Sequence, residues 1–244
     1  MTAMTEHTIK AFDAELQDLG RIITEMGGLA ERQISEALEA LNRQDPELAA
    51  TVVDADARVD ALQREAEEKA IATIARRQPL GVDLRDIVGA LRVSNDLERI
   101  GDLAKNIAKR VQVVAGDDTD DTHAAVMRGI EHMATMALSQ IKDVLDAYAR
   151  RDSEKALQVW RSDGEIDAVN NSLFRELLTY MMEDQRKIGV CIHLMFCAKN
   201  IERMGDHATN IAETIYYMVE GHILADERPK SDTTASTRLP YLKD

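Results

Sequence analysis

A twelve-residue motif occurs twice in this chain, and its repetition constrains the fold more than any other feature of the sequence. The two copies cover Leu97–Ala108 and Ile201–Ala212 and share eight identical positions at an offset of 104 residues. In a helix, Glu98, Asp102 and Asn106 of the first copy lie one above another, because side chains four residues apart are neighbours on one face. Their counterparts in the second copy are Glu202, Asp206 and Asn210. Carboxylates on adjacent turns repel each other, so the duplicated motif indicates a site for positive charge.

The segments around the motif have a helical pattern throughout. Apolar residues recur at helical spacing over residues 6–41, 46–77, 83–115, 122–150, 153–184 and 187–220. Asp45 followed by Pro46 is typical of a helix start, and Asp152 repeats this cap at an offset of 107. Valine, threonine and aromatic residues are too sparse for a large sheet. The sequence therefore predicts an all-α fold of two tandem three-helix antiparallel bundles, with six long helices related by an internal repeat.

The same repeat predicts the domain boundaries. We expect a first bundle at residues 6–116, a second at 121–222 after a short acidic linker, and a loosely ordered C-terminal tail at 223–244.

Charge and composition exclude several classes of protein. The 30 basic and 44 acidic residues give a net charge of −14, which argues against a nucleic-acid partner bound through general electrostatics. Cys191 and Cys197 form no CxxC motif and are interpreted as reduced core residues. The N-terminus shows no signal peptide, and no apolar run approaches the ~20 residues of a membrane-spanning helix. We therefore expect a soluble, cytoplasmic protein.

A second acidic pair accompanies each copy of the motif. Asp56 and Asp60 lie four residues apart in the second predicted helix, and Asp60 precedes the turn near Pro79 by about as many residues as Glu98 follows it. In an antiparallel helical hairpin, the pair Asp56 and Asp60 and the pair Glu98 and Asp102 then lie at nearly the same level along the helix axes. Asp163 and Asp167 occupy the matching positions of the second repeat. Each repeat is thus predicted to gather four carboxylates, whose oxygen ligands suit Mg²⁺, Ca²⁺, Mn²⁺ or iron, with zinc less favoured.

The acidic pairs can also be interpreted as ordinary solvent-facing residues that bind no metal, since such pairs are common on solvated helix faces. If a metal binds, Arg99 and Arg203 are expected to offset charge or hold the ligands in place. Asn106 and Asn210 are expected either to ligate the metal or to donate to its ligands. Gln33 and Gln140, which also correspond, are interpreted as packing at the edge of the core. His207 is not expected to be a ligand, because leucine replaces it in the first copy.

The glycine inside each copy needs its own explanation. Gly101 and Gly205 each cost a helix roughly 1 kcal/mol relative to alanine. Their presence at the same motif position indicates the close approach of another backbone or of a ligand.

At these acidic motifs the sequence resembles the PhoU family of phosphate-transport regulators, over about residues 6–222. The resemblance rests on two Glu-x-x-x-Asp motifs, each with a partner Asp-x-x-x-Asp pair, in two three-helix repeats. It implies metal ions on the acidic faces, sometimes as multinuclear clusters, and a cytoplasmic homodimer that reaches the membrane only through its partners. It also implies a negative regulator of the phosphate-starvation response, without enzymatic activity. Such a protein links the phosphate ABC transporter, through its ATPase subunit, to a sensor histidine kinase and restrains both uptake and kinase output.

Two other functions compete with this one. A carboxylate-bridged di-metal oxidase would need Glu-x-x-His pairs, and none of the six histidines has a glutamate three residues before it. A purely structural helical dimeriser would leave the acidic pairs facing solvent. A nucleotide-binding P-loop is absent from the sequence.

Overall fold

Helices make up almost all of the chain that this computed structural model describes, namely residues 2–115, 121–225 and 228. The elements are α1 Thr2–Arg43, α2 Pro46–Arg77, α3 Val82–Val114, α4 Asp121–Arg150, α5 Ser153–Arg161, α6 Asp163–Glu183, a 3₁₀ turn η1 Gln185–Lys187 and α7 Ile188–Glu220. No strand occurs in these ranges, so the predicted all-α fold is confirmed. The predicted linker at 116–120 and most of the predicted tail lie outside the described residues.

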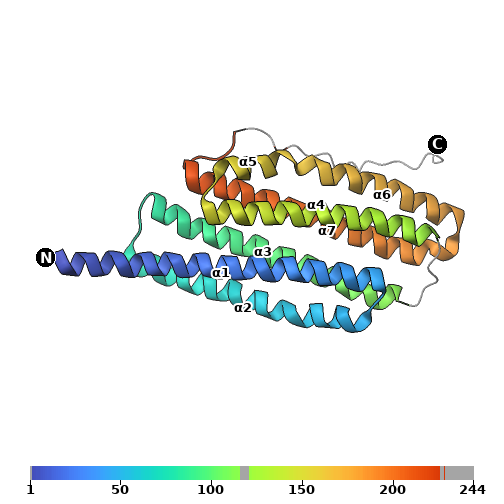
Figure 1. Cartoon of the computed structure of the whole chain (residues 1–244), viewed down its shortest axis with the longest axis horizontal. Coiled ribbons are helices and arrows are strands. Elements are labelled where there is room, and N and C mark those ends of the chain that lie inside the picture. The colour runs from blue at the N-terminus through green and yellow to red at the C-terminus, as the bar shows by residue number, and fades with distance from the viewer. Residues whose placement is uncertain (1, 116–120, 226–227, 229–244) are drawn as a thin grey trace.

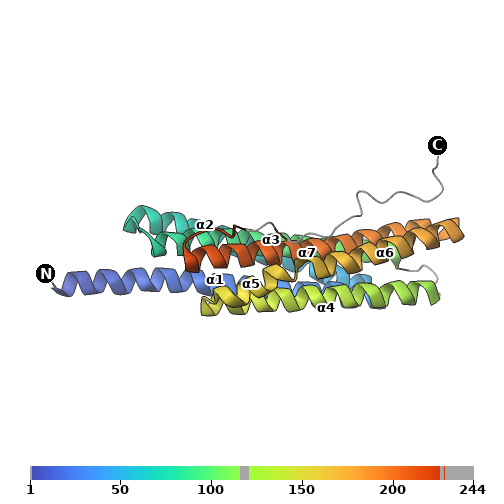
Figure 2. The ribbon, with the colours of Figure 1, turned by 90° about the horizontal axis from the view of Figure 1, so that it is seen from above.

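The helices form two bundles that lie side by side along the long axis (Figures 1 and 2). In one bundle α1, α2 and α3 all contact one another, and in the other α7 packs on α4, α5 and α6. The division of the chain into domains stays a prediction, because the two bundles share one large hydrophobic cluster.

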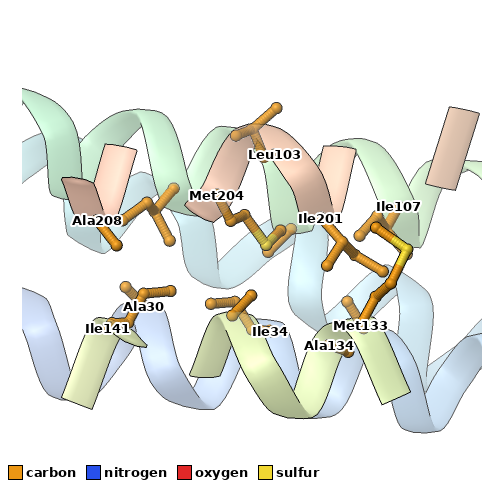
Figure 3. Packing of buried hydrophobic residues seen from close by; sticks show 14 of the residues in the cluster. Ala30, Ile34, Leu103, Ile107, Met133, Ala134, Ile141, Ile201, Met204 and Ala208 are labelled. Carbon is orange, nitrogen blue, oxygen red and sulfur yellow. The ribbon is translucent and has the colours of Figure 1, made fainter. Parts of the chain in front are cut away.

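Two pairs of helices join the bundles, α3 with α7 and α1 with α4. The α3–α7 pair is antiparallel, because Arg92 near the start of α3 lies over the ring of Tyr217 near the end of α7. At the other end of α3, Arg110 lies over the ring of Phe196, near the start of α7, at 4.2 Å. Figure 3 shows apolar side chains of all four helices meeting between the bundles, among them Ile34, Ile107, Ile141 and Met204. The four helices therefore hold both repeats in one core.

The cysteines belong to this core, as the sequence predicted. Cys191 and Cys197 are both buried and form no disulfide. Burial raises the pKa of the Cys197 thiol to about 12. None of the described helices is long and apolar enough to cross a membrane.

The predicted helix caps are confirmed in both repeats. The Asp45 carboxylate accepts hydrogen bonds from the backbone N–H groups of Glu47 and Leu48, each at 3.0 Å, and Pro46 is the first residue of α2. Asp152 accepts from Lys155 N–H at 2.9 Å in the same way. The residue before each cap, Gln44 or Arg151, has a positive φ and ends the preceding helix. The repeat thus extends to the backbone geometry of the turns.

The predicted fifth helix differs from expectation because it is divided at Ser162 into α5 and α6. The Ser162 hydroxyl donates to the backbone carbonyl of Val159 at 2.9 Å and so competes with the helical pattern. Gln140 of α4 donates to the carbonyl and hydroxyl oxygens of Ser162, at 3.3 and 3.1 Å. The first repeat has no such interruption, because α2 runs unbroken from Pro46 to Arg77.

Candidate functional site

The first acidic cluster consists of Asp56 and Asp60 on α2 and of Glu98 and Asp102 on α3. Burial raises the pKa of Glu98, and the charges of Asp102, Asp60 and Asp56 raise it further, while Arg99 lowers it. Asp56 is buried, and the other three are partly buried. The four carboxylates are therefore close enough to repel one another in a partly dehydrated site.

Lys105 supplies the positive charge of this cluster. Its ammonium group donates to Asp56 Oδ2 and, at 2.6 Å, to Asp102 Oδ1, so it links α2 to α3. Arg99 lies 3.5 Å from both Glu98 and Asp102, but its side chain is mostly exposed. The sequence singled out Arg99 and missed Lys105, although its position three residues after Asp102 was a usable signal.

Gln33 of α1 completes the cluster from a third helix. Its side chain is 2 % exposed, and neither its amide nitrogen nor its amide oxygen has a hydrogen-bond partner among the described atoms. A Cβ added at Gly101 would lie 3.0 Å from Gln33 Oε1 and 3.4 Å from Asp56 Oδ1. The close approach that the motif glycine indicated is thus made by two polar side chains rather than by a backbone.

The second acidic cluster consists of Asp163 and Asp167 on α6 and of Glu202 and Asp206 on α7. Burial raises the pKa of Glu202, the hydrogen bond and charge of Lys199 lower it, and the charges of Asp206 and Asp167 raise it again. Asp163, Asp167 and Glu202 are all buried. This cluster is therefore more deeply enclosed than the first.

Arg228 fills the second cluster from the C-terminal end of the chain. Its guanidinium donates to both oxygens of Asp163 at 2.7 Å, to Asp206 Oδ1 at 2.6 Å and to Asn210 Oδ1 at 3.1 Å. Thr209 also donates to Asp163, at 2.8 Å. Sequence reasoning missed Arg228, because no periodicity in the tail predicts where that residue lies.

The remaining candidate residues separate into two groups. Asn106 and Arg203 are exposed at the surface. Asn210 contacts Arg228 and also donates to Asp96 of α3 at 3.4 Å. His207 lies 2.8 Å from Asp96 and so joins the two bundles instead of entering a cluster.

The chemistry of both clusters suits a hard cation, although neither is arranged as a finished metal centre. Among the side chains that the structure describes, no three His, Cys, Asp or Glu groups are placed to hold one ion as they stand. Each cluster instead holds a protein cation between its carboxylates, Lys105 in one and Arg228 in the other. The donor set is oxygen-rich, and in the first cluster the unpartnered amide of Gln33 adds a further oxygen. Metal ligation by the eight acidic residues stays a prediction.

The fold and the clusters together define a class of all-α proteins made of two repeated three-helix bundles. Each bundle has a carboxylate cluster between its second and third helices, and in the second repeat α5 and α6 together form the second helix. A family model described as PhoU domain matches the chain twice, at residues 23–111 and 130–215. The chain belongs to the PhoU domain family.

Relatives match over nearly the whole chain. A protein of Rhizobium meliloti named phosphate-specific transport system accessory protein PhoU homolog is 56 % identical over 94 % of this chain and 96 % of its own length. A protein of Caulobacter vibrioides with the same name is 50 % identical over 94 % of this chain and 98 % of its own.

Solved structures share the fold. The crystal structure of PhoU from Pseudomonas aeruginosa is similar with a TM-score of 0.81 and 36 % identity, over 86 % of this chain and 100 % of that one. A phosphate transport system regulatory protein PhoU from Streptococcus pneumoniae gives a TM-score of 0.80 at 27 % identity, over 87 % of this chain and 99 % of that one.

Proposed function

We propose that this chain is an accessory protein of a phosphate-specific transport system and that it acts by binding other proteins rather than by catalysis. The single observation that carries this proposal is the match to relatives of that name at 56 % and 50 % identity over almost their full lengths. Most of both helical repeats and all eight acidic residues of the clusters fall within the residues that match the family model. A shared surface for the same kind of partner is the simplest consequence of that likeness.

The proposed role is that of a negative regulator in the cytoplasm. In this role a homodimer links the ATPase subunit of the phosphate transporter to a sensor histidine kinase and restrains uptake and kinase output when phosphate is plentiful. Support comes from the family membership and from relatives named as accessory proteins of the phosphate-specific transport system.

Metal ions are the second part of the proposal. Asp56, Asp60, Glu98 and Asp102 would hold metal in the first repeat. The corresponding ligands of the second repeat would be Asp163, Asp167, Glu202 and Asp206. Magnesium, manganese, iron or zinc would supply positive charge between α2 and α3 in the first repeat and between α6 and α7 in the second. The support is that burial, and to a lesser extent the neighbouring carboxylate charges, raise the pKa values of Glu98 and Glu202, together with the unpartnered Gln33 amide beside Asp56.

The regulatory role is tested with a phosphate-starvation reporter in the host cell. Deleting the gene for this chain should switch the reporter on at high phosphate, and the parent chain should switch it off again. Glu98→Ala combined with Glu202→Ala should fail to restore repression. The matched control, Glu67→Ala with Glu131→Ala, removes two exposed glutamates outside the clusters and should restore it. A deletion strain that stays repressed would overturn negative regulation, and full repression by the cluster variant would overturn a role for the clusters.

The metal is tested separately, by elemental analysis of the purified protein and by calorimetry with Mn²⁺. Asp102→Asn with Asp206→Asn should reduce both metal content and Mn²⁺ affinity, because each substitution removes one charge from a cluster. Equal binding by parent and variant would remove the metal from the proposal. Oxygen consumption by iron-loaded protein distinguishes an oxidase, and we expect none.

A further inference from the structure

The cations that pair with the aspartates of the two acidic clusters come from different parts of the chain, whereas Glu202 of the second cluster pairs with Lys199 of α7 at 2.8 Å. In the first cluster Lys105 lies on α3 itself, one turn after Asp102. The equivalent residue of the second motif is Thr209, which is neutral and buried. The second repeat therefore lacks a cation of its own at this position, and Arg228 provides one from eight residues beyond Glu220, where α7 ends.

The second cluster has the geometry of a receptor for a guanidinium group. All three side-chain nitrogens of Arg228 donate to it: Nε and one terminal nitrogen bind the two oxygens of Asp163 as a fork. The same terminal nitrogen reaches the side chain and the backbone carbonyl of Asp206, the latter at 3.2 Å, and the other one reaches Asn210. Such planar, two-pronged recognition selects arginine over lysine.

The burial of Asp163 makes its ion pair with Arg228 important for the stability of the fold. The Asp163 side chain is 4 % exposed. A buried carboxylate without a charged partner is strongly destabilising, and Thr209 contributes only a neutral hydrogen bond. A positive group beside Asp163 therefore stabilises the folded chain, and Arg228 is the one that the structure places there.

We propose that the second cluster is a guanidinium-binding site, occupied by Arg228 of the same chain, and that a metal ion binds there only by displacing Arg228. The metal half of this inference rests on the proposed metal binding, whereas the guanidinium half does not. Displacement makes the two clusters unequal, because Lys105 remains tethered to its own helix whereas Arg228 belongs to the segment after α7. Metal loading of the second repeat is thereby coupled to release of that arginine.

Chemical rescue tests the guanidinium site without any metal. In chelator, Arg228→Ala should lower the melting temperature, and argininamide should restore more of the loss than lysinamide at the same concentration and ionic strength. Lys230→Ala, two residues further on, removes one charge from the tail and should leave the melting temperature close to that of the parent. An Arg228→Ala variant that melts like the parent, or equal rescue by the two amides, would overturn the site.

Mn²⁺ titration tests the displacement. The Asp102→Asn substitution lowers the Mn²⁺ affinity of the first cluster, so that the Mn²⁺ binding measured in this background is mainly that of the second cluster. Adding Arg228→Ala there should tighten Mn²⁺ by about tenfold or more, as expected for loss of charge-assisted hydrogen bonds to the competing cation. Adding Lys142→Ala instead, which removes a mostly exposed cation outside both clusters, should have no such effect.

The outcomes separate the two claims. If the Asp102→Asn protein binds Mn²⁺ with the same affinity whether or not Arg228 is present, mutual exclusion is wrong although metal binding stands. If neither the parent nor any variant binds Mn²⁺, the metal half fails together with the proposed metal function, and the rescue experiment alone decides the guanidinium site.

Discussion

Single residues set the electrostatics of the two clusters, and Lys105 is the clearest case. Its burial opposes the charged form, but hydrogen bonds to Asp102 and Asp56 outweigh that effect and raise its pKa. The ammonium therefore stays charged at any physiological pH, and it offsets the repulsion within the first cluster.

Removing this ammonium should destabilise the chain. We expect Lys105→Met to lower the free energy of unfolding by about 1–3 kcal/mol in chelator at neutral pH, because Asp56 is left buried without its partner. Urea denaturation measures the change. Asp56→Asn made in the Lys105→Met background should recover part of the loss, and a double variant that is less stable than Lys105→Met would contradict the pairing.

Glu98 should make stability depend on pH in the opposite sense to an ordinary paired carboxylate. Its raised pKa means that the folded chain binds more protons than the unfolded chain, so stability falls as pH rises above the ordinary value of 4.5. In chelator, Glu98→Gln should therefore melt at a higher temperature than the parent at pH 7.5, with the advantage vanishing below pH 4.5. Glu67→Gln, an exposed control on α2, should show no such trend. An advantage that is constant with pH would argue against this account.

Among the elements, α1 packs against Leu145 of α4 at Gly27, the first of two adjacent glycines. A Cβ at Gly27 would lie 2.6 Å from Leu145 Cδ2, whereas a Cβ at Gly28 would meet nothing within 4 Å. An alanine gains the same helix propensity at both positions, but it contacts Leu145 only at position 27. Each substitution is therefore a control for the other.

We expect Gly28→Ala to raise the free energy of unfolding by about 1 kcal/mol, through helix propensity alone. Gly27→Ala should be less stable than Gly28→Ala by about 1–3 kcal/mol, because Leu145 must move or the helices must separate. Thermal and urea unfolding measure both. Equal stability of the two variants would show that the α1–α4 contact accommodates the added methyl group with no loss in the free energy of unfolding.

At the scale of the whole molecule, the shared core should make the two repeats unfold together. Ile34 of α1 is fully buried in the cluster that also contains residues of α3, α4 and α7 (Figure 3). Ile34→Ala should cost about 2–5 kcal/mol. Hydrogen exchange should then accelerate in α7 as well as in the first bundle.

The control for this substitution is Ile71→Ala on α2, where the side chain is 65 % exposed. We expect it to change stability by no more than about 0.5 kcal/mol. If Ile34→Ala left the exchange of α7 unchanged, the repeats would be separate folding units, as the predicted domain boundaries would allow.

Local patterns were enough to predict all the helices apart from the break at Ser162, together with the caps at Asp45 and Asp152 and the burial of both cysteines. Those features depend on side chains close together in sequence, so periodicity and capping chemistry report them directly. The proximity of Asp56 and Asp60 to Glu98 and Asp102 could also be predicted. Residues that lie equally far before and after a tight turn between antiparallel helices are at the same level along the helix axes.

The sequence by itself therefore determined the repeat, the all-α class and the position of the acidic residues along each helix. Only the tertiary structure decided that Gln140 meets the break at Ser162, that Lys105 and Arg228 pair with aspartates of the clusters, and that α3 and α7 join both repeats in one core. These contacts bring together residues far apart in the chain or side chains with several possible directions. Their choice depends on packing and on the cost of a buried charge, which no local pattern records.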